Sequence, residues 1–330
     1  MAFTGEYPHG VGQVGDIPSF LGQFPERLAS LPSHAAEHPA GAMVLYALLA
    51  RVWPGLDGAT LLTVAIGCLG ALPVAALARD ELGQDGVRWS LALWVLSPMV
   101  VLYTATSADA VFAVALAGAA VAAHRGLVRR SWAWTVSGGV LLWVGSMLTY
   151  TAVLLLVFLL VSAAGRLRSE PGWVLGWAAA TAVTVLGLAG LLWLAAGYDP
   201  VAAVRAVHSA YQAAPGSARR PYLSWLVGDP IAFGGMLGVP LFAALVVRAV
   251  AVVRQRAWTG FDAAVLACLL AASSWGFSRG EVERIFLFLV PLALVPVVRQ
   301  LQVWQARLPA VAALLVAQTI AVQLLFCTRW

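Results

Sequence analysis

The stretch 172–197, GWVLGWAAATAVTVLGLAGLLWLAAG, has no charged side chain. A helix of this length can cross the ~30 Å hydrocarbon core of a bilayer. The same character extends through the chain, because 61% of its 330 residues are hydrophobic and only 11% are charged. The mean hydropathy is +0.86, and so few polar side chains cannot cover the surface of a soluble protein. The sequence therefore predicts an all-α, polytopic transmembrane helical bundle.

About ten apolar runs are long enough to span. We expect them near 59–79, 89–106, 108–124, 131–147, 149–165, 172–197, 230–250, 260–277, 283–299 and 307–326. The run 39–54 is too short to cross comfortably and contains Arg51, so it predicts a helix lying in the membrane interface.

Arg residues concentrate in alternate connections between these runs. Cytoplasmic loops collect Arg, so this pattern orients the chain in a plasma membrane and explains the net charge of +5 without a nucleic-acid partner. We therefore predict an extracytoplasmic region, residues 1–58, followed by a transmembrane bundle, residues 59–330. An external loop, 198–229, and an external turn, 277–284, interrupt the bundle.

The segment SRGEVERIFLFLVP, Ser278–Pro291, contains the charged residues Glu281, Glu283 and Arg284 at the mouth of a predicted span. Charge is costly at this depth, so the segment predicts a functional site. The alternative is a structural ion pair between Arg284 and one of the two glutamates.

Asp109 is a second costly charge, with no basic residue near it in sequence. It lies between the segments LYTAT and AVFAVALAGAA, where two apolar runs meet. We expect it to face a cavity, a metal or a partner arginine. The alternative is that Ser107 and Asp109 cap the helix that follows.

Five segments of the chain resemble, in order, the GT-C superfamily of integral-membrane glycosyltransferases. The likeness is to a group of high-GC bacterial membrane proteins distantly similar to the protein-mannosyl- and aminoarabinose-transferase branch. The segments are Glu6-Tyr7, His38-Pro39-Ala40-Gly41, Ser97-Pro98 with TATSADAVF, Arg220-Pro221-Tyr222, and GEVERIFLFLVP.

The resemblance implies an inverting hexosyl- or pentosyltransferase. Such an enzyme moves a sugar from a polyprenyl-phosphate donor to an extracytoplasmic glycan, lipid or protein acceptor. It implies catalytic carboxylates, with Glu6 or the alternative Asp16 as general base and Asp109 as a second acid. It also implies residues that bind the donor phosphate (Arg284, His38, Arg220) and residues that support them (Glu281, Glu283, Tyr222). For Glu6, Asp16, His38 and Arg220, the alternative is an ordinary role in a solvated or anchoring loop.

Two features depart from the GT-C pattern. Ala40 replaces the second proline of an HPP-type motif, and no membrane helix precedes Glu6, so we expect the native start to lie upstream of Met1. The acids also leave open a divalent metal beside the lipid-linked sugar. The rival hypotheses are a transporter or lipid flippase, and a non-catalytic GT-C homologue that only binds lipid-linked sugar. An enzyme predicts that Glu6 or Asp16, Asp109, Glu283 and Arg284 converge around one cavity.

Overall fold

The computed structural model describes residues 5–213, 221–257, 260–276 and 280–325. In these ranges the chain forms helices and no strand, which confirms the predicted helical bundle. In chain order the helices are η1 (Tyr7–Gln13), α1 (Ile17–Gly22), α2 (Phe24–Arg27), η2 (Leu28–Ser30), α3 (Ser33–Ala36), α4 (Ala40–Val52), α5 (Gly55–Cys68), α6 (Ala71–Leu96), α7 (Pro98–Thr106), α8 (Asp109–Arg129), α9 (Trp132–Leu148), η3 (Tyr150–Val153), α10 (Leu154–Leu167), α11 (Pro171–Ala196), α12 (Pro200–Ala213), α13 (Tyr222–Leu237), α14 (Val239–Arg254), α15 (Phe261–Ser274), α16 (Val282–Ile285), η5 (Phe286–Leu289), α17 (Val290–Val303) and α18 (Leu308–Leu325).

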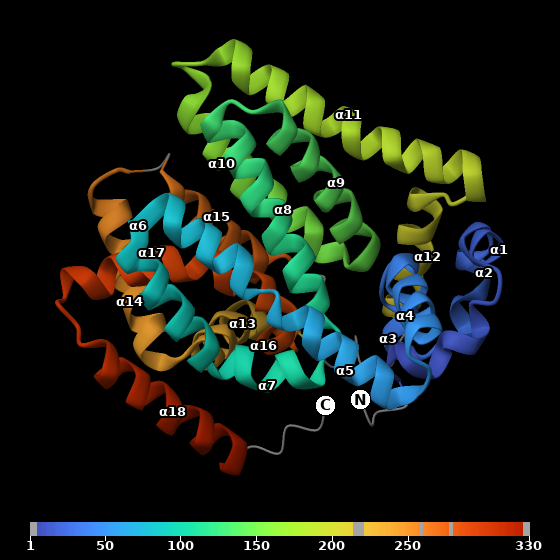
Figure 1. Ribbon diagram of the computed structural model, residues 1–330, viewed down its shortest axis with the longest axis horizontal. Helices are drawn as coiled ribbons and strands as arrows, with labels where there is room; N and C mark the ends of the chain where they lie inside the picture. Colours follow the sequence, from blue (N-terminus) through green and yellow to red (C-terminus); the bar gives the residue numbers. More distant parts are fainter. Residues whose placement is uncertain (1–4, 214–220, 258–259, 277–279, 326–330) are drawn as a thin grey trace.

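Among the described residues, 6 helical segments are long and apolar enough to cross a membrane. They are Gly55–Leu96, Asp109–Arg129, Tyr150–Leu167, Pro171–Ala196, Val282–Val303 and Leu308–Leu325. In Figure 1, α5 with the first half of α6, α11 and α18 run in similar directions across the molecule. The predicted runs 59–79 and 89–106 correspond to the two arms of α5–α6–α7, because Gly83 interrupts α6 with a φ of 75°.

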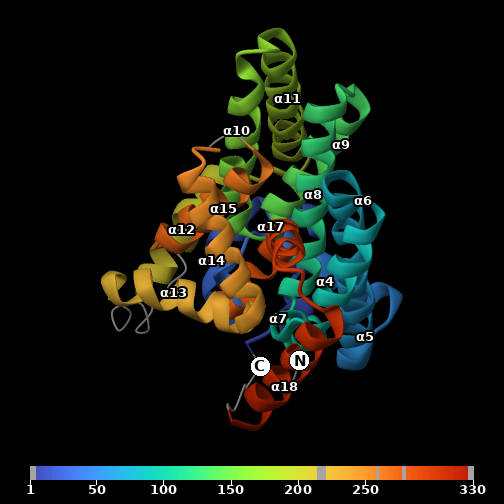
Figure 2. The same cartoon turned by 90° about the vertical axis from the view of Figure 1, so that its left-hand side faces the viewer.

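The segment from α16 to α17 forms the centre of the bundle. In Figure 2, α17 is seen nearly end-on, with α6, α8, α14 and α15 around it. In the segment from η5 to α17, the residues from Phe286 to Val298 are buried. A membrane helix that faced lipid would expose one side, so this segment is surrounded by protein. This central position explains why the charges that precede α17 are enclosed by protein.

Two boundaries differ from the sequence prediction. The expected span 230–250 is broken at Gly238, which has a φ of 118° and separates α13 from α14. The expected loop 198–229 contains α12 and the first turns of α13. Both helices are short, and Pro230 lies inside α13, so hydropathy alone gave no clear signal for them.

The N-terminal region forms a second, smaller core. Its large buried side chains include Tyr7, Phe20, Phe24, Met43 and Tyr46. The helix predicted at 39–54 is present as α4, which buries one face in this core, and its place in the membrane interface stays a prediction. The region packs against the start of α8, so it lies over one end of the bundle.

Helices α8 and α9 pack closely enough that a glycine is required between them. A Cβ atom placed on Gly138 would lie 2.6 Å from the Ala123 backbone nitrogen, closer than any real contact. Small residues let membrane helices approach in this way. By contrast, a Cβ on Gly187 of α11 would meet nothing within 4 Å.

Replacing Gly138 with Ala is therefore expected to destabilise the protein by about 2 kcal/mol, through the overpacking of two backbones. Gly187→Ala is the matched control, and it should be neutral or stabilise α11 by up to about 1 kcal/mol through helix propensity. Thermal unfolding of the purified variants in detergent measures the difference. Equal unfolding midpoints would show that α8 can move away from α9 at no cost.

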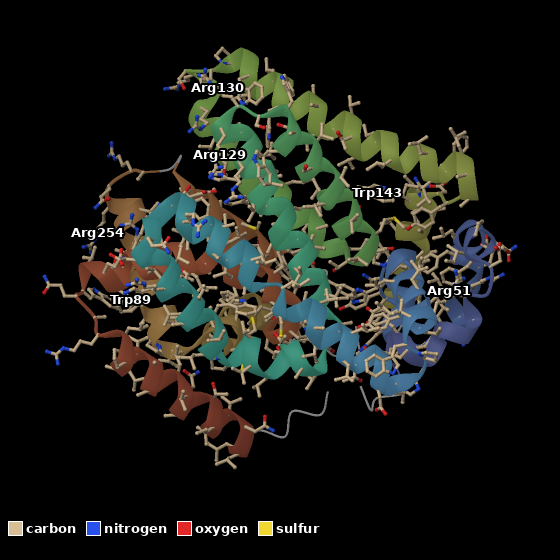
Figure 3. All side chains as sticks on the ribbon, viewed as in Figure 1. Arg51, Trp89, Arg129, Arg130, Trp143 and Arg254 are labelled. Atoms are coloured by element: carbon tan, nitrogen blue, oxygen red, sulfur yellow. The ribbon has the colours of Figure 1, made fainter. Side chains whose placement is uncertain are left out.

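Polar side chains gather at the two ends of α8. Its 21 residues give a length of about 30 Å, which matches the hydrocarbon thickness. Asp109 begins the helix, and Arg129 ends it in a group of basic residues. Figure 3 shows Arg129, Arg130 and Arg254 together on one side of the molecule, far from Arg51. We call the region around Arg129, Arg130 and Arg254 the Arg-rich end of the molecule. The region around Asp109, at the other end of α8, is the Asp109 end.

Candidate functional site

A buried ion pair joins two parts of the sequence at the Asp109 end. The Arg284 Nη1 atom donates to Asp109 Oδ2 over 2.5 Å. Asp109 and Arg284 are only 4% and 6% exposed. The Ser107 hydroxyl also donates to Asp109 Oδ2, over 2.7 Å. The expectation that Asp109 faces a partner arginine is thus confirmed. The capping alternative holds for Ser107, whose hydroxyl oxygen accepts from the Asp109 N–H at the start of α8 over 3.2 Å.

The turn before α16 supplies a second carboxylate to the same guanidinium. Arg284 Nη2 donates to Glu281 Oε2 over 2.8 Å, which is one of the two pairs expected from the sequence. Glu281 has a φ of 62°, a left-handed conformation that costs a non-glycine residue about 1 kcal/mol. Its side chain is 24% exposed, so it forms the more accessible side of the pair. Glu283 is partly buried in the next turn.

Aromatic rings cover the inner side of this pair. The Tyr7 ring lies 5.4 Å from Tyr46 in a stacked arrangement, and His38 lies 5.7 Å from Tyr7 and 5.6 Å from Phe112. Burial raises the pKa of Tyr7 well above its usual value, and the negative charges of Asp109 and Glu6 raise it further. The Tyr7 phenol therefore stays protonated and can donate a hydrogen bond.

Glu6 is held by a partner that sequence reasoning missed. Its Oε1 atom lies 3.0 Å from His34 Nδ1, and Glu6 is only 5% exposed. Its second oxygen, Oε2, is buried without a hydrogen-bond partner among the described residues. A buried acceptor left unsatisfied costs ~1–3 kcal/mol, so a hydroxyl placed beside it would bind favourably.

The remaining candidates lie elsewhere or outside the described residues. Asp16 is exposed, and its side chain accepts a hydrogen bond from the Ser19 N–H at the start of α1, so the structure does not bring it to Asp109. The Tyr222 hydroxyl donates to the Ser274 carbonyl over 2.9 Å, beside Gly276. Arg220 falls outside the described residues.

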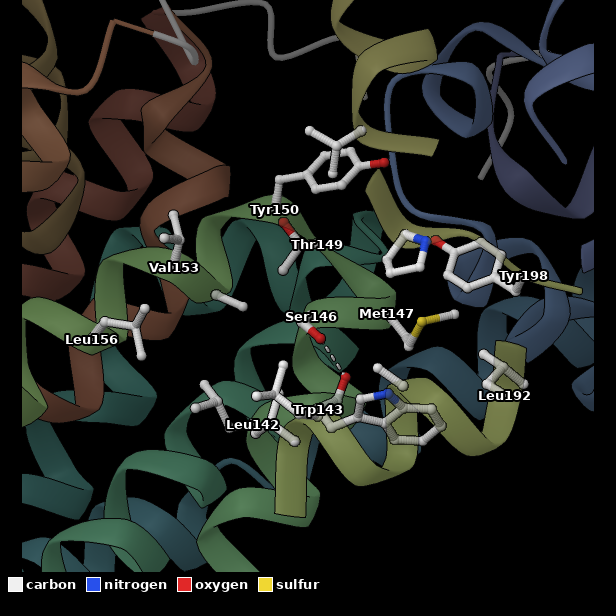
Figure 4. A pocket seen from close by; sticks show the side chains of 16 residues that line it. Leu142, Trp143, Ser146, Met147, Thr149, Tyr150, Val153, Leu156, Leu192 and Tyr198 are labelled. Atoms are coloured by element: carbon white, nitrogen blue, oxygen red, sulfur yellow. Dashed lines mark hydrogen bonds between the residues drawn. The ribbon is translucent and has the colours of Figure 1, made fainter. Parts of the chain in front are cut away.

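An apolar pocket of about 360 Å³ lies next to the segment around Leu148 that contacts His38 (Figure 4), and Glu6, Asp109 and Arg284 do not line it. Its walls come from α9, η3, α10, α11 and α12. Met147 and Thr149 line it on either side of Leu148, whose carbonyl lies 3.4 Å from His38 Nδ1. Tyr198 also lines the pocket, and its side chain lies near the Ala40 backbone at the start of α4. The pocket therefore ends at the segment that positions His38.

The contact with Leu148 defines the tautomer of His38. A carbonyl oxygen can only accept, so Nδ1 carries the hydrogen and Nε2 of the neutral ring presents a lone pair. Burial lowers the pKa of His38 to about 4, so the ring is neutral at pH 7. In this state His38 can accept a proton at Nε2, and it could donate to a phosphate only after it is protonated.

His38 is expected to make stability fall as the solution is acidified. The unfolded residue titrates near 6.5, so between pH ~6.5 and ~4 the unfolded chain binds a proton that the folded chain does not. The expected loss is about 2 kcal/mol at pH 4.5, and none above pH ~7. Unfolding midpoints of wild type and His38→Asn, compared from pH 7.5 to 4.5, measure this effect. A difference that does not vary with pH would contradict it.

No protein-family model matches this sequence, and comparisons with curated proteins and with solved structures found no match. What the site does is therefore inferred from its own residues. Among the described residues, no three His, Cys, Asp or Glu side chains group as metal ligands would.

Proposed function

We propose that the chain is a GT-C-type glycosyltransferase that moves a sugar from a polyprenyl-phosphate donor to an extracytoplasmic acceptor. The observation that carries this proposal is the buried contact of Arg284 with Asp109 and Glu281. The proposal includes a multi-pass path of about ten crossings in the plasma membrane, a GT-C-like architecture and an outward-facing Asp109 end.

Arg284 is the group best suited to hold the donor phosphate. A guanidinium stays charged at any physiological pH and gives paired hydrogen bonds to phosphate oxygens. In the structure both terminal nitrogens already contact carboxylates. Glu281 is the more exposed of these partners, so we infer that the phosphate displaces Glu281 while Asp109 keeps Arg284 in position.

The pocket beside His38 offers a place for the lipid part of the donor. Its lining is almost entirely apolar, from residues such as Leu142, Leu156 and Leu192. A polyprenyl chain in this pocket would bring its phosphate toward the segment around His38. Burial of ~25 cal/mol per Å² of apolar surface would favour such binding.

The transfer itself needs one base, because phosphate is already a good leaving group. The acceptor hydroxyl oxygen attacks the anomeric carbon, the bond from that carbon to the phosphate oxygen breaks, and the hydroxyl proton passes to a carboxylate. Glu6 fits this role through its unsatisfied Oε2 atom, with His34 holding its other oxygen. Asp109 is the second candidate, because both of the described hydrogen bonds that its carboxylate accepts fall on Oδ2.

Mass spectrometry of cell-envelope glycolipids and glycans in a deletion strain tests the proposal. We expect one sugar to be missing, to return with wild type, and to stay missing with Glu6→Gln or Asp109→Asn. Asp57→Asn, which changes an exposed acid on α5, is the matched control and should restore the sugar. An unchanged profile in the deletion strain would instead favour a transporter, a flippase or a non-catalytic homologue.

A further inference from the structure

A polar cavity lies at the Arg-rich end, remote from the site above. Its volume is about 460 Å³, and α6, α8, α10 and the start of α15 contribute to its walls. The polar residues that line it are Glu81, His124, Ser162, Arg166 and Ser169. The sequence gave no indication of it beyond the excess of arginine in nearby connections.

Two buried side chains lining this cavity have unsatisfied polar atoms. His124 is 7% exposed and Ser162 is 8% exposed. Neither His124 Nδ1 nor Ser162 Oγ has a hydrogen-bond partner among the described residues. The other nitrogen of His124, Nε2, lies 3.2 Å from a Glu81 oxygen and donates to it. The fold thus leaves two polar atoms beside a cavity that can hold a ligand.

The start of α15 contributes a positive potential to the same cavity. Gly260 and Phe261 line it, and Gly260 is the N-cap of this 14-residue helix. A glycine has no side chain to accept from the first N–H groups, which together with the helix dipole attract anions. Within the parts of the chain that the structure describes, this helix start lies beside Arg166 and the two unsatisfied atoms.

The charges around the cavity also favour an anion. Glu81 is already paired with Arg299 over 2.6 Å, so it does not add an uncompensated negative charge. Arg166 lies 3.4 Å from Glu170, whereas Arg130 lies closer to the same carboxylate, at 2.9 Å. Arg130 is thus the main partner of Glu170. Arg166 is therefore the cation of the lining that can best turn toward a ligand.

We propose that this cavity binds a phosphate group, held by Arg166, Ser162 and the N-terminus of α15. At the end of a membrane bundle, the phosphate belongs either to an anionic lipid head group or to a soluble phosphate compound. Basic pockets between membrane helices bind lipid head groups in this way. With Nε2 donating to Glu81, Nδ1 of the neutral His124 ring is an acceptor, so it can receive a hydrogen bond from a hydroxyl group of the ligand.

Binding to the purified full chain in nanodiscs tests the proposal. One arm uses phosphatidylcholine nanodiscs and adds inorganic phosphate, and the other compares pure phosphatidylcholine with nanodiscs that include phosphatidylglycerol. Native mass spectrometry counts bound lipid, and thermal shift reports bound phosphate. The variants are Arg166→Gln, which removes a positive charge, and Ser162→Ala, which removes a hydroxyl without changing the charge. Arg129→Gln is the control, because Arg129 pairs with Asp80 and does not line the cavity.

We expect wild type to bind at least one of the two probes, with affinity about 10-fold weaker in Arg166→Gln, about 3-fold weaker in Ser162→Ala and unchanged in Arg129→Gln. Binding of phosphatidylglycerol without inorganic phosphate would assign the site to a lipid head group, and the reverse would assign it to a soluble phosphate. The proposal is overturned if neither probe binds, or if Arg129→Gln weakens binding as much as Arg166→Gln.

Discussion

Replacing Asp109 with Asn is expected to slow sugar transfer by at least about 100-fold. An amide cannot take up a proton and cannot balance the charge of Arg284. In the wild type, Arg284 Nη1 donates to the Asp109 carboxylate over 2.5 Å. Losing a carboxylate that acts in proton transfer typically costs ~10²–10⁴ in rate. The rate of sugar release from lipid-linked donor in membranes with equal protein levels measures the effect.

A milder variant separates function from folding. Ser107→Ala removes the hydrogen bond that Asp109 Oδ2 accepts from Ser107 and the acceptor of the Asp109 N–H, and it leaves the ion pair intact. We therefore expect about a 10-fold slower transfer and a loss of stability of about 1 kcal/mol. Asp57→Asn should retain the wild-type rate. Full transfer by Asp109→Asn would contradict the role given to this carboxylate.

The largest loss of stability is expected from Asp262→Asn at the Arg-rich end. Asp262 contacts Arg248 over 2.6 Å and also pairs with Arg299, which in turn contacts Glu81. The variant leaves two partly buried arginines short of a counter-charge. Removing one partner from a buried ion pair costs ~3–5 kcal/mol, and we expect about 3 kcal/mol here because Glu81 still holds Arg299.

Asp85→Asn is the matched control for this prediction. Asp85 pairs with Arg88 at 3.9 Å, and both side chains are more than three-quarters exposed, at 86% and 77%. Exposed pairs contribute little, so the control should unfold at the wild-type temperature. Thermal unfolding in detergent compares the two variants. Equal midpoints would mean that the Asp262 network does not stabilise the bundle.

Hydropathy predicted the larger helices because each of them consists of one uninterrupted apolar segment of the sequence. Runs 108–124 and 172–197 correspond to α8 and α11. The break at Gly238 and the helix α12 were not predicted, since a left-handed glycine and a short amphipathic helix leave only weak traces in hydropathy. The count of about ten crossings stays a prediction.

The cost of burying charge identified Asp109 and Arg284 from the sequence, and the structure joins them across 175 positions of the chain. Tyr7 was marked only through the resemblance, and His34 was not marked at all. Neither an isolated histidine nor a tyrosine carries a local pattern, so only tertiary packing reveals them. His124 also lacks a local pattern, yet it is buried against Glu81.

Binding of a polyprenyl monophosphate tests the central claim most directly, because this product is common to every donor sugar. Wild type and Arg284→Lys are first checked for cooperative unfolding. Their binding to the polyprenyl monophosphate and to the free polyprenol is then compared in nanodiscs. We predict that wild type binds the phosphate at least 10-fold more tightly than the alcohol, and that the variant loses most of this preference, since lysine cannot form the paired contact. Equal binding of phosphate and alcohol by wild type would contradict a donor-phosphate site at Arg284.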